Sequence, residues 1–392
     1  MAQGNEGEDN RNAVDSSDSL VVETTNTQRQ RLAAGTLTCP PEPELPALPF
    51  DLLPEILCRL PVKLLVQLRC VCKFFNSLIS DPNFAKKHLR MSTKRHHLML
   101  TNSCDYDYYY DRDIVMCDSP IPSIFSTSTV VTQTQLYIPN TLTNGHHCID
   151  LMMSSCDGIF CGKLNNGSYF LWNPSIRKFK LLPPLRNHKW SLLSFGYDHF
   201  IDNYKVVAHS FKKVISVNTL GTDYWRRIKD IPYSNPISGH GLFVSGTVNW
   251  FAYDVIISLD LEKESYQKLR LPDFDNENNS WDVGVVRDCL CVFASSDEYW
   301  DVWIMKEYGN QESWTKLYTI PNLQDQDLEA DRALYISEDD QLLVQCHQDW
   351  AECDDMKLVV YDSKAGTLNF PVFRNNYKHT HAEVYIESLI SP

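Results

Sequence analysis

The side chains that could take part in chemistry are scattered along this sequence and form no catalytic pattern. It contains no G-x-S-x-G, no H-E-x-x-H, no P-loop and no G-x-G-x-x-G after a strand-like segment. Histidines gather at His96–His97, at His146–His147 and at His379 and His381. Adjacent strand residues point to opposite faces, and no third ligand accompanies His379 and His381. We therefore expect no catalytic residue, no metal site and no cofactor.

The cysteines indicate a reducing compartment, the cytoplasm or the nucleus. There are 13 of them, an odd number, with no C-x-x-C pair, whereas a disulfide framework or a zinc site would be more regular. The pairs Cys70/Cys72 and Cys289/Cys291 lie in apolar segments, so we expect them to be buried thiols.

Charge and hydropathy argue against a nucleic-acid-binding, a membrane-spanning or a secreted protein. The 392 residues include 36 basic and 50 acidic side chains, for a net charge of −14. A nucleic-acid-binding protein would need a basic face. No stretch approaches the roughly 18 to 20 apolar residues that span a bilayer, and the acidic, polar start MAQGNEGEDNRN does not resemble a secretory signal.

Aromatic residues in acidic segments are the candidates for binding a protein substrate, because exposed Trp and Tyr often anchor recognition. The candidates are Tyr108, Trp281, Tyr299, Trp300 and Trp350. Their acidic surroundings suggest a basic patch on the bound partner. The alternative is that they pack in a core, as we expect for Trp172, Trp225, Trp250, Trp303 and Trp314.

Three segments could position these residues. Residues 1–45 have no hydrophobic periodicity and are rich in polar residues, so we expect a disordered tail. Residues 46–92 carry apolar side chains at helical spacing, such as Leu53, Ile56, Leu57 and Leu60. Three short helices are predicted there, with more apolar residues than their own core can use. This surplus indicates a partner surface, or else a helical cap packed on the rest of the chain.

Residues 95–392 change to short strands separated by turn residues. A phrase with an apolar strand, a polar turn, an aromatic, a basic residue and an apolar-Pro end recurs about every 42 to 55 residues. It begins at Tyr169, Val214, Ile256, Val302 and Lys357. Such a repeat predicts a β-propeller, with five visible blades and a sixth from residues 95–145. The alternative fold is a large β-sandwich.

The segment LPFDLLPEILCRLPVKLLVQLRCVCKFFNSLISDPNFAKKHL closely resembles a plant F-box. Mild departures are Gln67 and Leu68 at positions usually basic and Phe, Cys72 for Ser, and Phe75 for Trp. The resemblance implies that a Skp-type adaptor binds the apolar surface of this segment. Some of its apolar side chains would instead form the internal core of the helices. The adaptor-binding candidates are Leu48, Pro49, Leu52, Ile56, Leu57, Leu60, Pro61, Val62, Leu65 and Leu68.

The phrases WNPSIRKFKLLPP, GTDYWR, SGTVNWF, ISLDLEKE and WIMKEYGNQESWTKL resemble the plant F-box-associated interaction domain, which is often labelled kelch-like. Together the two resemblances imply a non-catalytic substrate-recognition subunit of an SCF ubiquitin ligase. Its adaptor would connect it to a cullin, and its β domain would hold a target protein for ubiquitination. The alternative is an F-box scaffold, or a glycan- or protein-binding module, that acts outside the ligase.

Overall fold

The computed structural model divides the chain into two compact units, Met1–Leu48 and Pro49–Pro392. The residues that the structure describes all belong to the second unit. They are residues 52–91, 95–101, 115–126, 130–136, 149–164, 167–185, 191–210, 214–234, 236–273, 280–296, 298–321, 328–348, 356–374 and 381–392. The tail expected over residues 1–45 lies outside them.

Four short helices open the described chain: α1 (Leu53–Leu57), α2 (Val62–Leu68), α3 (Lys73–Ile79) and α4 (Pro82–Arg90). Three helices were expected, and the fourth, α4, begins at Pro82. Asp81 caps α4, since its Oδ1 accepts hydrogen bonds from the backbone N–H groups of Asn83 (2.7 Å) and Phe84 (3.2 Å). Pro82 at the first helical position needs no such partner. None of the helices in the described ranges has the length and apolar character to cross a membrane.

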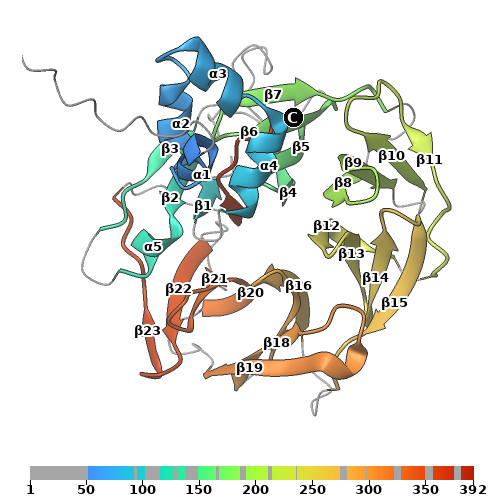
Figure 1. The fold of residues 1–392 in the computed structure, drawn as a ribbon. Helices are drawn as coiled ribbons and strands as arrows, with labels where there is room; N and C mark the ends of the chain where they lie inside the picture. The colour runs from blue at the N-terminus through green and yellow to red at the C-terminus, as the bar shows by residue number, and fades with distance from the viewer. Residues whose placement is uncertain are drawn as a thin grey trace, which may run out of the picture. The chain divides into compact units, whose positions relative to one another are not determined.

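Six antiparallel four-stranded sheets follow and are arranged in a ring (Figure 1). Three consecutive sheets are formed by β4 (Ile149–Cys156), β5 (Ile159–Leu164), β6 (Tyr169–Asn173) and β7 (Lys178–Leu181); by β8 (Ser191–Asp198), β9 (Asn203–Ser210), β10 (Ile215–Thr219) and β11 (Arg226–Arg227); and by β12 (Ser238–Val244), β13 (Thr247–Ala252), β14 (Val255–Asp260) and β15 (Ser265–Arg270).

The next two sheets are formed by β16 (Ser280–Val286), β17 (Cys289–Ser295), β18 (Tyr299–Met305) and β19 (Trp314–Pro321), and by β20 (Leu328–Ile336), β21 (Gln341–Gln348), β22 (Met356–Asp362) and β23 (Thr367–Asn369). The last joins both ends of the described chain: β24 (His381–Ile386), β1 (His96–Thr101), β2 (Met116–Pro120) and β3 (Thr134–Leu136). Two short helices, α5 (Ile121–Ile124) and η3 (Gln311–Ser313), lie between strands. The fold is therefore a six-bladed β-propeller preceded by short helices, which confirms the predicted fold class and excludes the β-sandwich.

The recurring phrase forms the third and fourth strands of five blades, such as β6 with β7 and β14 with β15. Its expected core tryptophans are confirmed for Trp172 and Trp250, which are 1% and 0% exposed. Trp225, Trp303 and Trp314 are half-buried. The repeat therefore marks the outer half of each blade.

The sixth blade closes the ring by pairing strands from opposite ends of the chain. β24 pairs with β1 in antiparallel register, with Leu98 opposite Val384. The residues after β24 are tied to the next blade, because Asn173 Nδ2 donates hydrogen bonds to the carbonyl oxygens of Ser388 (3.1 Å) and Ile390 (2.8 Å). These contacts fix the innermost strand of the closing blade.

The helices and the propeller share one hydrophobic core. Leu57, Val62 and Leu65 belong to the same buried cluster as Phe195 of β8 and Ile390 near the C-terminus. The helices therefore cannot be separated from the propeller without exposing part of its core.

Polar contacts reinforce this junction. Arg95 Nη2 donates a 3.0 Å hydrogen bond to the carbonyl oxygen of Cys58, and Lys86 of α4 forms an ion pair with Asp202 in the turn after β8. The alternative expectation of a helical cap is therefore partly realised, since these helices do pack on the propeller.

The prediction of buried thiols was wrong for Cys70 and Cys72. Both are exposed, because they lie in the break between α2 and α3 and not on a buried helix face. Cys291 is buried in β17, as expected, and Cys289 is only half-buried.

Candidate functional site

The helical segment presents a set of exposed apolar side chains, which we call the docking face. It comprises Leu52, Ile56, Leu64, Val71 and Phe74, with exposed fractions between 44% and 67%. A groove of about 430 Å³ adjoins it. The groove is lined by Pro54, Phe74, Ser77, Leu78, Asp81, Asn83, Phe84 and Lys87. An apolar helical surface of this kind suits a partner that packs helices against it.

The structure leaves three of the adaptor-binding candidates accessible. Leu52, Ile56 and Pro61 are exposed. Leu48 and Pro49 lie outside the described residues. Leu64, Val71 and Phe74 were missed by sequence reasoning, although their apolar character beside the other candidates was a usable signal.

The other candidates on these helices face inward. Leu57 is 5% exposed and Val62 and Leu65 are 0% exposed, so these three are not accessible to an adaptor. Each packs in the core that the helices share with the propeller. Leu60 and Leu68 are half-buried against the same core.

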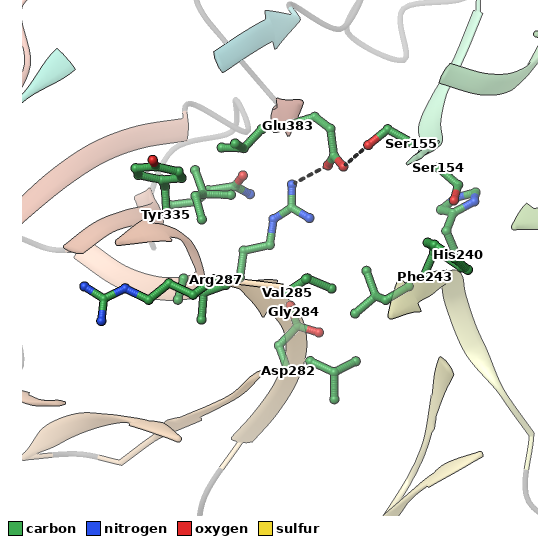
Figure 2. Close-up of a pocket in the computed structure, with 18 of the residues that line it drawn as sticks. Ser154, Ser155, His240, Phe243, Asp282, Gly284, Val285, Arg287, Tyr335 and Glu383 are labelled. Atoms are coloured by element: carbon green, nitrogen blue, oxygen red, sulfur yellow. Dashed lines mark hydrogen bonds and ion pairs between the residues drawn. The ribbon is translucent and has the colours of Figure 1, made fainter. Parts of the chain in front are cut away.

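A cavity of about 870 Å³ occupies the middle of the ring and is lined mainly by the innermost strands β4, β12, β16, β20 and β24. We call it the channel. Glu383 forms an ion pair with Arg332 (3.5 Å) there and accepts a hydrogen bond from Ser155 Oγ (3.2 Å), and dashed lines in Figure 2 mark these two interactions. Burial raises the pKa of Glu383. These side chains connect three blades across the channel wall.

A smaller cavity of about 390 Å³, which we call the recess, opens between β16–β17 and β20–β21. Its lining residues are Trp281, Asp282, Phe293, Ser295, Glu329, Ala330, Asp331 and His347. Asp282 and Asp331 line both the recess and the channel. The two cavities therefore share a wall of carboxylates.

The pKa values of two of these carboxylates are shifted in opposite directions. Burial raises the pKa of Asp282 to about 6. Burial also tends to raise the pKa of Asp331, but the hydrogen bond with His347 Nε2 (3.1 Å) and other contacts hold that pKa below its usual value. Gln345 Nε2 donates a further hydrogen bond to Asp331 at 2.6 Å.

The aromatic residues predicted to bind substrate differ in their exposure. Trp281 lines the recess and is half-buried, and Tyr299 is also half-buried. Trp300 is 0% exposed and packs in the core, so its assignment to the substrate surface was wrong. Neighbouring residues of a strand point to opposite faces, and Trp300 takes the inward one. Tyr108 and Trp350 lie outside the described residues.

Tyr253 is a strongly exposed aromatic residue that sequence reasoning missed. Tyr253 is 82% exposed in the tight turn between β13 and β14, where its φ of 63° is in the left-handed region. A non-glycine residue rarely takes that conformation. The usable signal was the dipeptide Tyr253–Asp254 between two apolar strands, where a turn normally has glycine or asparagine.

The helices and the recess lie at opposite faces of the propeller. Every blade repeats the same up-and-down order, so all innermost strands run in the same direction. Lys86 of α4 contacts the turn in which β8 ends, whereas Trp281 and Glu329 stand near the starts of β16 and β20. A protein bound at the recess would therefore leave the docking face free.

Among the described residues, no group of three or more His, Cys, Asp or Glu side chains is placed to hold a metal ion.

Sequence comparison assigns both parts of the chain. Residues 45–87 match the F-box domain, and residues 112–392 match the F-box associated beta propeller domain. The chain belongs to this family. This F-box/propeller protein is 29% identical over 378 residues to the F-box/kelch-repeat protein At3g23880 of Arabidopsis thaliana, covering 88% of this chain and 96% of that protein. It is 26% identical over 393 residues to F-box protein CPR1 of the same plant, covering 88% of each.

Among solved structures, the F-box/propeller chain is weakly similar to the one titled "YCF48 bound to D1 peptide". The TM-score is 0.36 and the identity 12%, covering 67% of this chain and 73% of that one. The family assignment rests on the sequence matches. F-box proteins are generally non-catalytic adaptor subunits, and an F-box implies binding to a Skp-type adaptor.

Proposed function

We propose that this protein is the substrate-recognition subunit of an SCF ubiquitin ligase. A Skp-type adaptor binds its docking face and connects it to a cullin, while the propeller holds a target protein for ubiquitination. The single observation that carries the proposal is an F-box with exposed apolar side chains whose inner face is part of the propeller core.

The shared core explains how such a subunit would act without chemistry of its own. Holding a substrate at a fixed position near a ubiquitin-charged enzyme raises the effective concentration of the reacting groups. A rigid connection between the docking face and the recess keeps that position constant. The proposed subunit is non-catalytic, and the proposed site of action is the cytoplasm, the nucleus or both.

Co-purification tests the proposal directly. The full-length protein is expressed with a Skp-type adaptor and a cullin, alongside an Ile56→Glu variant. Ile56 is 44% exposed on the docking face, so a carboxylate there should leave folding intact. Buried in an apolar interface, the same carboxylate should weaken adaptor binding by at least about tenfold, or 1.4 kcal/mol.

The matched control is Leu181→Glu, because Leu181 is 49% exposed but lies on the outer strand β7 of the propeller. Adaptor and cullin should be recovered with the wild type and this control, and lost with Ile56→Glu. Equal recovery with both variants would refute the docking face. Recovery of the adaptor without the cullin would instead favour a scaffold that acts outside the ligase.

A further inference from the structure

The recess has the composition of a site for a positive charge. Three carboxylates line it, from Asp282, Glu329 and Asp331, and none of its described lining residues is lysine or arginine. On β20, Arg332 pairs with Glu383 and donates to the carbonyl oxygen of Ala382, and its charge also acts on Asp282 and Asp331. His347 Nε2 also pairs with Asp331 Oδ2 at 3.1 Å, so the lining sets three carboxylates against one histidine and no lysine or arginine.

Gln345 independently indicates that a hydrogen-bond donor is missing beside Asp331. Its side chain is 3% exposed and lines the channel, and its Nε2 donates to Asp331. Its Oε1, within the same amide group and therefore close to Asp331, is buried and accepts no hydrogen bond from any described residue. A buried acceptor without a donor is costly, so this position favours a ligand that brings N–H groups.

Trp281 gives the recess an aromatic wall beside the carboxylates. A cation is attracted to the face of an indole ring, most strongly where water is excluded. The same blade already holds one ammonium group in this way: Lys316 Nζ lies 2.5 Å from Asp301 Oδ2 and 5.2 Å from the ring centre of Trp303. The recess repeats that combination without a lysine of its own.

We propose that the recess binds a basic side chain, lysine or arginine, carried by the protein that the propeller recognises. The side chain enters beside Trp281, and its N–H groups donate to the carboxylates of Glu329 and Asp331. A volume of about 390 Å³ is within the range of small-ligand pockets. This proposal rests on the proposed function and adds the chemical class of the substrate.

Direct binding to model side chains tests it on the full-length protein. The probes are Nα-acetyl-arginine amide and Nα-acetyl-lysine amide, followed by saturation-transfer NMR. Their neutral counterparts are Nα-acetyl-citrulline amide and the Nε-acetylated lysine amide. We expect a Kd on the order of millimolar for the two charged probes and no saturation with the neutral ones. Raising the salt from about 50 to about 300 mM should weaken the binding.

Two variants remove charge without changing shape. Glu329 is exposed, so Glu329→Gln should fold normally and weaken binding by roughly threefold or more. Asp282→Asn removes the carboxylate on the shared wall and should act in the same direction. The matched control is Glu262→Gln, an exposed residue in the turn between β14 and β15, which should leave the Kd unchanged.

Equal binding of charged and neutral probes, an absence of saturation, or an unchanged Kd in both recess variants would overturn the proposal. These readouts need no adaptor, and the co-purification experiment with Ile56→Glu needs no recess. The two proposals can therefore fail separately.

Discussion

Replacing Gly241 by alanine should test how closely the inner strands of the propeller are packed. Gly241 lies on β12, and its backbone is part of the channel wall. A methyl group there would stand 2.2 Å from Val248 Cγ1, 2.6 Å from Ser194 Oγ and 2.7 Å from Trp250 Nε1. Real Cβ atoms do not approach other atoms so closely, and valine is stiff, so the neighbours must move.

The magnitude follows from what the methyl group displaces. Ser194 Oγ accepts hydrogen bonds from the Gly241 N–H (2.8 Å) and from the indole N–H of Trp250 (3.1 Å). Overpacking costs about 1–3 kcal/mol, and a buried indole N–H left without a partner costs about 1–3 kcal/mol more. We expect the free energy of unfolding to fall by about 2–6 kcal/mol, a large part of the about 5–15 kcal/mol typical of a domain.

Gly284 is the matched control, since it occupies the innermost strand β16 and also lines the channel. A methyl group there would meet only the carbonyl oxygen of Ala333, at 3.4 Å. Gly284→Ala should therefore change the free energy of unfolding by less than about 1 kcal/mol. Urea unfolding followed by tryptophan fluorescence measures both variants. Similar values for the two would refute the argument from close packing.

Three further predictions concern single side chains. Leu65 is 0% exposed and Leu64 is 46% exposed. In urea unfolding, Leu65→Ala should therefore cost about 2–5 kcal/mol, whereas Leu64→Ala should cost less than about 1 kcal/mol and instead weaken adaptor pull-down. Reversed effects would contradict the assignment of Leu65 to the core and Leu64 to the docking face. Burial lowers the pKa of His209 from 6.5 to about 4, so its neutral form stabilises the fold above pH 6.5, and this stability is lost as the pH falls toward 4. When the pH is lowered from 7 to 4.5, the free energy of unfolding of His209→Gln should fall by about 2–3 kcal/mol less than that of the wild type. If urea titrations show the same fall for both proteins, His209 is not the source of the pH dependence. Tyr253→Gly should keep or raise the thermal midpoint, because glycine removes the strain of the left-handed φ of 63°, which offsets the higher entropy of its unfolded chain. A clear fall in the midpoint would instead show that the tyrosine ring makes stabilising contacts in solution.

The period of the hydrophobic pattern is local, and it correctly predicted both halves of the architecture. The stripe around Leu53 to Leu60 predicted helices, and the phrase beginning at Tyr169 predicted the outer strands of propeller blades. The F-box and its associated propeller were identified from the same residues. Each of these features depends on neighbours within a few turns of helix or one hairpin, so the sequence alone was sufficient.

Three-dimensional contacts between distant segments decided the rest. Ile56 and Leu57 are adjacent and similar in character, yet Leu57 packs against the propeller and Ile56 remains exposed. The closing strand β24 pairs with β1 nearly 300 residues away, which no local pattern indicates. The recess combines Trp281 with Glu329 and His347 from another blade. Such sites depend on which blades become neighbours when the ring closes, because side chains far apart in sequence meet only through that closure.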